Sequence, residues 1–387
     1  MIYEFLRFFV EIALKFYFRT IYYLNEENIP DNQPVIVASN HSNSALDAII
    51  IDAFLRKNKL YWLARGDVFA NKWVGKFMTS VRTAPIYRSS EVGFVDIKRN
   101  NESFEICFQL LNKNRMVGIF PEGVTVPELK LQTPFKKGFA RLAFQAQEAI
   151  GRPVMILPIG VSYHSLTQTR TDVFVKFGLP FSSDLFYQNY KKNQAFGLKS
   201  ITQHLEVELN KLIINYDSVT NKALLRKSLK FENNTLVNQK SREFGLSKDP
   251  RFFENDLKIV NEFIEAEANN TFESFSKTIN ENIALDSPKL NIIYLSILPI
   301  FVVLGQILSF IPNQISKFII RSKIKNAAFF GSVRFAVLYL LFPIYTIICA
   351  ILVNLFIGNG FWLTLILIPV LVGIGLRCKS LLVGENL

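Results

Sequence analysis

The chain has 387 residues, half of them hydrophobic and 36 of them Phe, and it carries a formal net charge of +12. A basic chain with this apolar excess favours a protein on anionic membranes over a nucleic-acid-binding protein, because no nucleic-acid-binding motif occurs and the apolar residues lie in long runs. Three scattered cysteines, Cys107, Cys349 and Cys378, exclude a disulfide framework or zinc knuckle and predict a catalytic part in a reducing, cytosolic compartment.

Residues 1–24 are predicted to form an amphipathic helix that lies in the membrane interface. Charged residues recur there every three or four positions, which places them on one stripe of a helix. These residues are Glu4, Arg7, Glu11, Lys15 and Arg19. The rest of the circumference is aromatic or aliphatic, which suits a helix in the membrane interface. No small-residue cleavage site follows, which argues against a signal peptide. A helix packed on the soluble core is the alternative.

Residues 25–185 alternate short apolar runs with helical stretches. The runs are "PVIVAS", "LYWLAR", "TAPIY", "RMVGIF", "VMILPIGVSY" and "DVFVKFG", and the helices are expected at 46–54, 94–111 and 138–147. Nearly continuous hydrophobic strands between helices predict an α/β fold, with a mostly parallel sheet covered by helices on both faces. Ligands in such sheets bind where strands end and loops begin.

The remaining sequence divides into two parts. Residues 186–288 are polar and are expected to form a helical appendage without recognisable chemistry, in which His204 is a surface or interface residue. Residues 289–387 are expected to form a membrane region, because the segments 291–311, 335–357 and 361–376 are long and apolar.

The charges between these apolar segments constrain the topology. If all three segments crossed the membrane from a cytoplasmic catalytic part, the basic residues of 317–325 and 377–379 would lie outside, against the positive-inside rule. We therefore predict that 291–311, which contains Pro299, does not span, and that 335–357 and 361–376 form a hairpin anchor. The catalytic domain would then face the cytoplasm at the cytoplasmic membrane.

Asn40 and His41 directly follow "PVIVAS", so they stand at the edge of the sheet where sites assemble. An imidazole there can act as a general base near neutral pH, and a carboxylate can orient it. Asp47 is the nearby acid, but six residues of regular helix turn through about 600° and would separate the two side chains. The pair therefore requires that the segment between them begins as a turn. A purely structural histidine is the alternative.

Other polar residues follow later strands. Glu122 and Gly123 belong to "GIFPEGVTV", where a Pro-Glu-Gly turn can present a carboxylate and backbone N–H groups. Arg88 closes "TAPIYR", and Lys136 and Lys137 precede a predicted helix. Cations beside a helix N-terminus favour a phosphate-bearing ligand, although each one taken alone could be a solvated surface charge.

Taken together, these pieces resemble the glycerolipid acyltransferase superfamily, the glycerol-3-phosphate and lysophosphatidic acid acyltransferases. "NHSNSALD", "TAPIYR", "IFPEG" and "ILPIGVSY", which contains Pro158, are similar to the four sequence blocks of that superfamily. The resemblance spans roughly residues 30 to 180 of the chain.

The resemblance implies acyl transfer from acyl-CoA or acyl carrier protein to the hydroxyl of a glycerophosphate or lysolipid. In it, His41 is the base and Asp47 orients it, while Arg88, Glu122 and Gly123 bind the acceptor. Lys136 matches a lysine of the family, and we expect Asn40 and Lys137 to bind substrate as well. No metal or redox cofactor is needed, because the thioester is already activated. The oligomeric state is not predicted.

The sequence departs from the family pattern at two places. Five residues rather than four separate His41 from Asp47, which resembles a subgroup related to fungal glycerol-3-phosphate and dihydroxyacetone-phosphate acyltransferases. "FPEGVTV" lacks the arginine that commonly follows this block, which leaves open an acceptor without a simple phosphate. A thioester or lysolipid hydrolase is a further alternative, but "GVSYH" is not a nucleophile elbow, and His164 there is predicted to end a strand. A catalytically inactive lipid-binding protein is the non-enzymatic alternative.

Overall fold

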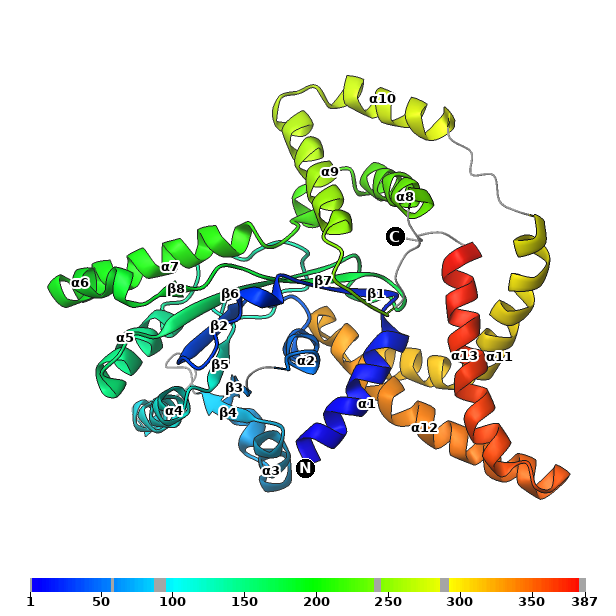
Figure 1. Cartoon of the computed structure of the whole chain (residues 1–387), viewed down its shortest axis with the longest axis horizontal. Helices are drawn as coiled ribbons and strands as arrows, with labels where there is room; N and C mark the ends of the chain where they lie inside the picture. Colours follow the sequence, from blue (N-terminus) through cyan, green and yellow to red (C-terminus); the bar gives the residue numbers. More distant parts are fainter. Residues whose placement is uncertain (1, 57–58, 87–94, 240–244, 286–291, 383–387) are drawn as a thin grey trace.

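The computed structural model describes residues 2–56, 59–86, 95–239, 245–285 and 292–382. Figure 1 shows a twisted sheet covered by helices, with the C-terminal helices gathered on one side of it. All six predicted strands and the three helices expected near residues 46–54, 94–111 and 138–147 are present. The predicted α/β class with a mostly parallel sheet is therefore confirmed.

The strands of the described residues form a single sheet in the order β4-β3-β5-β2-β6-β7-β1-β9, with β8 beside β6. The strands from β4 to β6 are parallel, β6 and β7 are antiparallel, and β7, β1 and β9 are parallel again. Their bounds are β1 Thr20–Leu24, β2 Val35–Ser39, β3 Leu60–Arg65, β4 Thr83–Ile86, β5 Met116–Ile119, β6 Met155–Tyr163, β7 Val173–Phe177, β8 Phe181–Ser182 and β9 Gly245–Ser247. The carboxyl ends of β5, β2 and β6 consequently meet at one edge.

Helices cover both faces because alternate strand residues are apolar on both sides. On one face, α1 (Ile2–Tyr17) and α2 (Ala45–Ala53) pack with Val35 and Val37 of β2. On the other, α4 (Val95–Asn112), α5 (Gly138–Ile150) and α7 (Gln194–Asn210) pack with Ile36 and Ala38. Further helices are α3 (Lys72–Ser80), α6 (Asp184–Lys192), α8 (Lys222–Gln239), α9 (Arg251–Ala268) and α10 (Phe272–Leu285).

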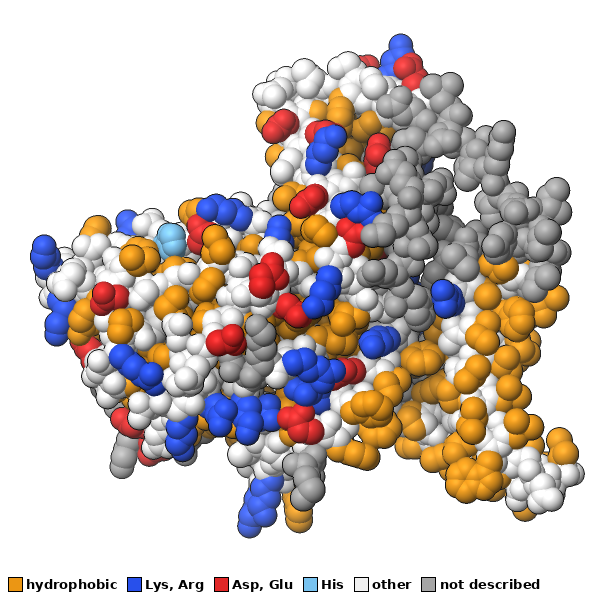
Figure 2. All heavy atoms as spheres, in the orientation of Figure 1, with side chains coloured by type: hydrophobic (Ala, Val, Ile, Leu, Met, Phe, Trp, Pro, Cys, Tyr) orange, Lys and Arg blue, Asp and Glu red, His pale blue; other side chains and the backbone are white. Residues whose placement is uncertain are grey.

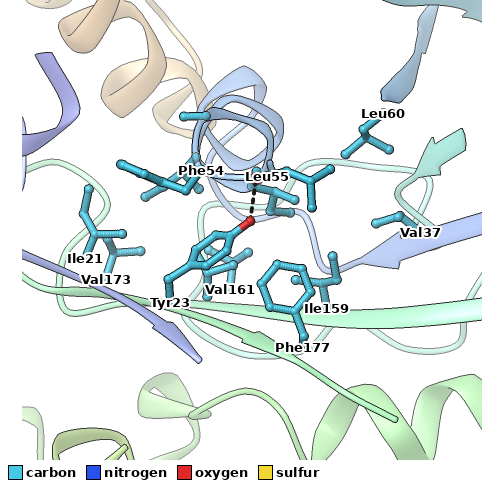
Figure 3. Packing of buried hydrophobic residues seen from close by; sticks show 14 of the residues in the cluster. Ile21, Tyr23, Val37, Phe54, Leu55, Leu60, Ile159, Val161, Val173 and Phe177 are labelled. Atoms are coloured by element: carbon cyan, nitrogen blue, oxygen red, sulfur yellow. Dashed lines mark hydrogen bonds between the residues drawn. The ribbon is translucent and has the colours of Figure 1, made fainter. Parts of the chain in front are cut away.

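Figure 3 shows the first of these cores from close by. The ring of Tyr23 from β1 packs against Phe54 and Phe177, and its hydroxyl donates a hydrogen bond of 3.0 Å to the carbonyl of Ile51 on α2. The buried hydroxyl is satisfied, so the aromatic ring can contribute its full apolar area to the core.

Two expected segment boundaries differ in the structure. The helix expected over 1–24 ends at Tyr17, and Thr20–Leu24 is β1, all of whose residues are buried. The segment 186–288 contributes β9, which pairs with β1, and its helices cover the sheet. After Arg19, the last residue of the charged stripe, the sequence continues with the buried run "TIYYL". This run has no charged residue to continue the amphipathic pattern of the helix.

In the first helix, α1, Arg7 and Glu11 of the charged stripe face the domain, Glu4 and Lys15 are exposed, and the aromatic face points outward. Arg7 donates to the carbonyl of Leu55 over 3.1 Å, and Arg56 pairs with Glu11 over 2.6 Å. The exposed face consists of Phe5, Phe8, Phe9, Ile12 and Phe16. Such an arrangement is opposite to that of an ordinary surface helix and supports the predicted interfacial position.

The C-terminal helices are α11 (Ile292–Lys323), α12 (Phe330–Ile357) and α13 (Phe361–Leu382). Within them, three stretches are long and apolar enough to cross a membrane: Leu298–Lys323, Ala327–Ile357 and Phe361–Lys379. Figure 2 shows their surface as an almost uninterrupted hydrophobic area, in contrast to the mixed charges over the sheet region. These features suggest membrane association. That 291–311 does not span, while the other two form the anchor, stays a prediction.

Candidate active site

His41 lies at the carboxyl edge of the sheet, two residues after the end of β2. Its Nδ1 is 3.0 Å from Oδ2 of Asp47. Because a carboxylate accepts hydrogen bonds, this contact places the proton of the imidazole on Nδ1 and leaves Nε2 as the unprotonated nitrogen. The His41 side chain keeps 17% of its surface exposed, whereas Asp47 is fully buried. An oriented imidazole with a free basic nitrogen at a partly open position can accept a proton from a substrate.

The carboxylate of Asp47 is held from three sides. Besides His41, the backbone N–H of Asn43 donates to Oδ2 over 2.8 Å, and the hydroxyl of Tyr163 donates to Oδ1 over 2.7 Å. Burial, followed by the charge of Asp47, raises the pKa of Tyr163 well above its ordinary value, so the phenol remains a donor. Three donors offset the burial of the charge and fix the direction in which it faces His41.

The segment between His41 and Asp47 begins as a turn, which is the condition that the pair requires. Residues 42–44 are bends and a turn, and α2 begins only at Ala45. Ser44 takes φ 49° and ψ −133°, a conformation that side chains rarely adopt. The turn over residues 42–44 thereby accommodates five intervening residues without separating His41 from Asp47.

The imidazole of His41 also belongs to an aromatic stack. It lies against Phe120 with ring centroids 3.9 Å apart, and Phe120 lies against Trp62 with centroids 4.7 Å apart. His41 follows β2, Phe120 follows β5 and Trp62 lies on β3, and these strands are neighbours in the sheet. The stack restricts rotation of the imidazole, so Asp47 and Phe120 together define its plane.

Glu122 lies beside this pair, after the end of β5. It is buried, and neither carboxylate oxygen has a hydrogen-bond partner among the described residues. Burial raises the pKa of Glu122 to about 8; the negative Asp47 raises it further, while the nearby backbone N–H groups of His41 and Gln132 lower it without reaching hydrogen-bond geometry. The carboxyl is therefore mostly protonated at pH 7 and can donate a hydrogen bond.

Gly123 and Lys136 lie against each other. Gly123 has φ +71°, and a Cβ built on it would lie 2.7 Å from Cγ of Lys136. The backbone N–H of Lys136 donates to the carbonyl of Pro121 over 2.7 Å. Glycine is thus required both by the turn and by the lysine stem that crosses it. Lys136 and Lys137 are exposed directly before α5, where their charges can meet an anion.

For two predicted substrate-binding residues, the structure shows no arrangement that supports the role. The side-chain amide of Asn40 is buried and makes two hydrogen bonds of 2.8 Å with the backbone N–H and carbonyl of Val161. It therefore ties the end of β2 to β6, and binding of substrate by Asn40 stays a prediction without a contact to support it. Arg88 lies outside the residues that the structure describes.

The other histidines lie apart from this pair. His164 follows the end of β6, as predicted, and its Nε2 is 2.5 Å from Asp256 in a buried contact. His204 is half-buried on α7 and packs against Phe181. Among the described residues, no three His, Cys, Asp or Glu side chains are close enough together to hold a metal ion.

Sequence reasoning missed three contributors to the site: Trp62, Phe120 and Tyr163. Each was part of a predicted strand or of the short run after it, but aromatic residues there are ordinary core residues. Their relation to His41 depends on strand order, which places β5 and β6 on either side of β2. Only the pairing of the strands shows which aromatic rings reach the imidazole.

Comparisons with known proteins find similarity to acyltransferases. Residues 20–162 match the family described as Acyltransferase. The chain is similar to the 1-acyl-sn-glycerol-3-phosphate acyltransferase of Bacillus subtilis, with 27% identity over 119 residues, which are 31% of this chain and 54% of that protein. The chain therefore spans about half the length of this curated relative. Both similarities are to acyltransferases and cover part of this chain.

A solved structure is also similar in part. It is the 1-acyl-sn-glycerophosphate acyltransferase from Thermotoga maritima, which is 19% identical, with a TM-score of 0.39 over 54% of this chain and 76% of that one. The family match ends at residue 162, so it includes the pair of His41 and Asp47 and the turn at Glu122, but not the C-terminal helices.

Proposed function

We propose that this protein transfers a fatty acyl group from acyl-CoA or acyl carrier protein to a hydroxyl of glycerol-3-phosphate or 1-acylglycerol-3-phosphate in phospholipid synthesis. The observation that carries the proposal is the contact of 3.0 Å between His41 and the buried Asp47, at the sheet edge within the matched region. With Nδ1 donating to Asp47, Nε2 is the ring nitrogen that can accept the proton of an alcohol.

The proposed reaction needs one base and an activated acyl group. Nε2 of His41 takes the proton of the acceptor hydroxyl as its oxygen attacks the thioester carbonyl. The tetrahedral intermediate then expels the thiolate, which takes the proton from the imidazolium and leaves as the thiol. Asp47 stabilises the imidazolium while it exists and keeps Nδ1 protonated throughout. No metal or redox cofactor enters this sequence of steps.

The surroundings of the pair suit an acceptor that carries a phosphate. Lys136 and Lys137 place two exposed positive charges before α5, next to the turn at Gly123. Glu122 is mostly protonated at pH 7, its two oxygens are buried without a hydrogen-bond partner among the described residues, and by the sequence resemblance it would bind the acceptor. By the sequence resemblance, Arg88 would contribute a third cation. Together these groups would orient the phosphate and leave a free hydroxyl near His41.

Membrane attachment follows from the same arrangement of apolar surface. The exposed aromatic face of α1 and the apolar helices α11 to α13 would hold the catalytic domain at an anionic membrane surface. We propose that the domain lies on the cytoplasmic side of the cytoplasmic membrane, where acyl donors are water-soluble and the acylated product remains in the bilayer.

The direct test is an acyl-transfer assay on the detergent-solubilised protein with labelled palmitoyl-CoA and, separately, palmitoyl-acyl carrier protein. Glycerol-3-phosphate, dihydroxyacetone phosphate, lysophosphatidate and a phosphate-free lysolipid are offered in parallel. Transfer to glycerol-3-phosphate or lysophosphatidate is expected. Release of free fatty acid irrespective of acceptor would instead indicate a hydrolase, and no product with either donor would indicate a lipid-binding protein.

A phosphate-free acceptor is the second candidate. It is favoured by one observation, the absence of the arginine that commonly follows "FPEG", where this chain has "VTV". Transfer confined to the phosphate-free lysolipid would establish this alternative.

A further inference from the structure

We propose that Ser332, on the first turn of α12, positions the turn between His41 and Asp47, so that docking of the C-terminal helices sets the geometry of the catalytic pair. The inference rests on the proposed function for its catalytic consequence. The contact itself joins residues 289 positions apart, between the α/β region and a helix outside the family match.

The hydroxyl of Ser332 bridges two backbone groups of this turn. It donates to the carbonyl of Asn43 over 2.5 Å and accepts from the backbone N–H of Leu46 over 3.0 Å. Asn43 and Leu46 both belong to the five residues that separate His41 from Asp47. The Ser332 hydroxyl therefore acts both as a donor and as an acceptor in this turn.

This contact adds an acceptor at the start of α2, where Ser44 makes no side-chain cap. A helix begins with backbone N–H groups that have no partner within the helix, and a serine at the N-cap position ordinarily accepts from one of them. Ser44 occupies that position of α2 but makes no side-chain cap, because its backbone conformation of φ 49° and ψ −133° serves the turn. The N–H of Leu46 donates to the carbonyl of Asn43 over 3.1 Å, and Ser332 supplies a second acceptor from another part of the chain.

The position of Asn43 links the cap to the catalytic pair. Its carbonyl accepts from Ser332, and its own N–H donates to Oδ2 of Asp47, the same oxygen that contacts His41. A shift of Asn43 would therefore move one of the three donors that orient Asp47. The path from α12 to the imidazole consists of Ser332, Asn43 and Asp47.

The first turn of α12 is seated closely enough to hold this serine in place. A Cβ on Gly331 would lie 2.3 Å from the side-chain oxygen of Asn43 and 2.6 Å from the carbonyl of Leu166, so only glycine fits. The hydroxyl of Tyr17 donates to the carbonyl of Gly331 over 3.3 Å. Phe335, one turn further, is buried in the core beneath the sheet. The contact is thus part of a packed interface.

Two measurements on the full-length protein test the proposal, with Ser332→Ala compared with Ser322→Ala. Ser322 is a suitable control because its hydroxyl bonds only within α11, to the carbonyl of Phe318. Amide hydrogen exchange reports the contact without reference to activity: the segment 43–47 should exchange faster in Ser332→Ala than in Ser322→Ala. Steady-state kinetics should show a kcat lowered roughly tenfold with an unchanged acceptor KM, because misplaced catalytic groups slow the chemical step.

A double-mutant cycle distinguishes positioning from general damage to the fold. In an Asp47→Asn background, Ser332→Ala should lower kcat by less than about twofold, since the group through which it acts is already impaired. An equal loss in both backgrounds, or unchanged exchange of 43–47, would overturn the proposal. A wild-type protein that transfers no acyl group would refute the proposed function, while the exchange measurement would still decide whether Ser332 holds the turn.

Discussion

The imidazole of His41 lies nearly parallel to the ring of Phe120, with centroids 3.9 Å apart and an angle of 11° between the planes. Phe120 in turn is parallel to Trp62. The base thus has an apolar wall on one face and a carboxylate at Nδ1, two restraints that fix different rotations of the same ring. Such fixation is what a general base needs when it must meet one hydroxyl of a bound acceptor.

Phe120→Leu tests whether the ring of Phe120 orients the imidazole of His41. Leucine preserves apolar volume but removes the flat surface, so we expect kcat to fall about three- to tenfold through a less restricted imidazole, and stability to fall by about 1 kcal/mol from the lost aromatic contacts. The matched control is Phe108→Leu on α4, which removes a ring that packs against Phe104. Equal kcat values for both variants would show that the stack does not orient His41.

Tyr163→Phe removes one of the three donors to Asp47. The buried Oδ1 would lose its hydrogen bond, and we expect a loss of about 1–3 kcal/mol in the free energy of unfolding together with a lower kcat. Chemical denaturation and steady-state kinetics measure the two effects. Tyr187→Phe is the control, because that exposed hydroxyl makes only a contact of 3.3 Å with Glu148. A Tyr163→Phe protein as stable and active as the control would contradict the role of the phenol.

The buried carboxyl of Glu122 predicts a pH dependence of stability. Its pKa is about 8 in the folded protein and about 4.5 ordinarily, so between these values the folded state holds a proton that the unfolded state has lost. Stability therefore falls as pH rises from about 4.5 to about 8, by at most about 1.4 kcal/mol per pH unit from this group.

Glu122→Gln should lack this contribution. Relative to wild type, the variant should gain stability steadily over the same pH range, by about 4 kcal/mol at pH 8, as measured by urea denaturation at several pH values. The exposed Glu105→Gln serves as the control and should follow the wild-type curve. A constant difference between Glu122→Gln and wild type from pH 5 to pH 8 would show that the carboxyl is not protonated in the folded state.

Much of the fold could be predicted from the sequence. Six of the seven strands within residues 25–185 were identifiable because each is a short apolar run with a polar or turn-forming boundary. β8, which has two residues, was not predicted, and neither were β1 and β9. "TIYYL" directly follows an amphipathic helix with the same aromatic composition, and "GLS" is too short to show a period. Both owe their strand conformation to pairing within the sheet.

The candidate site was predictable in its residues but not in its connections. His41, Glu122 and Gly123 follow predicted strands, so their position at one edge could be expected from a parallel sheet. The turn at Ser44 and the donors to Asp47 could not, since they depend on backbone conformation and on Tyr163 of a distant strand. The contact of Ser332 with this turn could not be predicted, because nothing in an apolar C-terminal segment indicates which of its residues contacts residues 43–46.

The most direct test of the account is the turnover number of His41→Ala in the acyl-transfer assay, measured beside His204→Ala and with the thermal unfolding midpoint of both variants. We expect His41→Ala to remain folded and to lose at least about a hundredfold in kcat, since general-base catalysis contributes that much or more. His204→Ala should retain most of the activity. A turnover number for His41→Ala equal to that of wild type would contradict the assignment of His41 as the base.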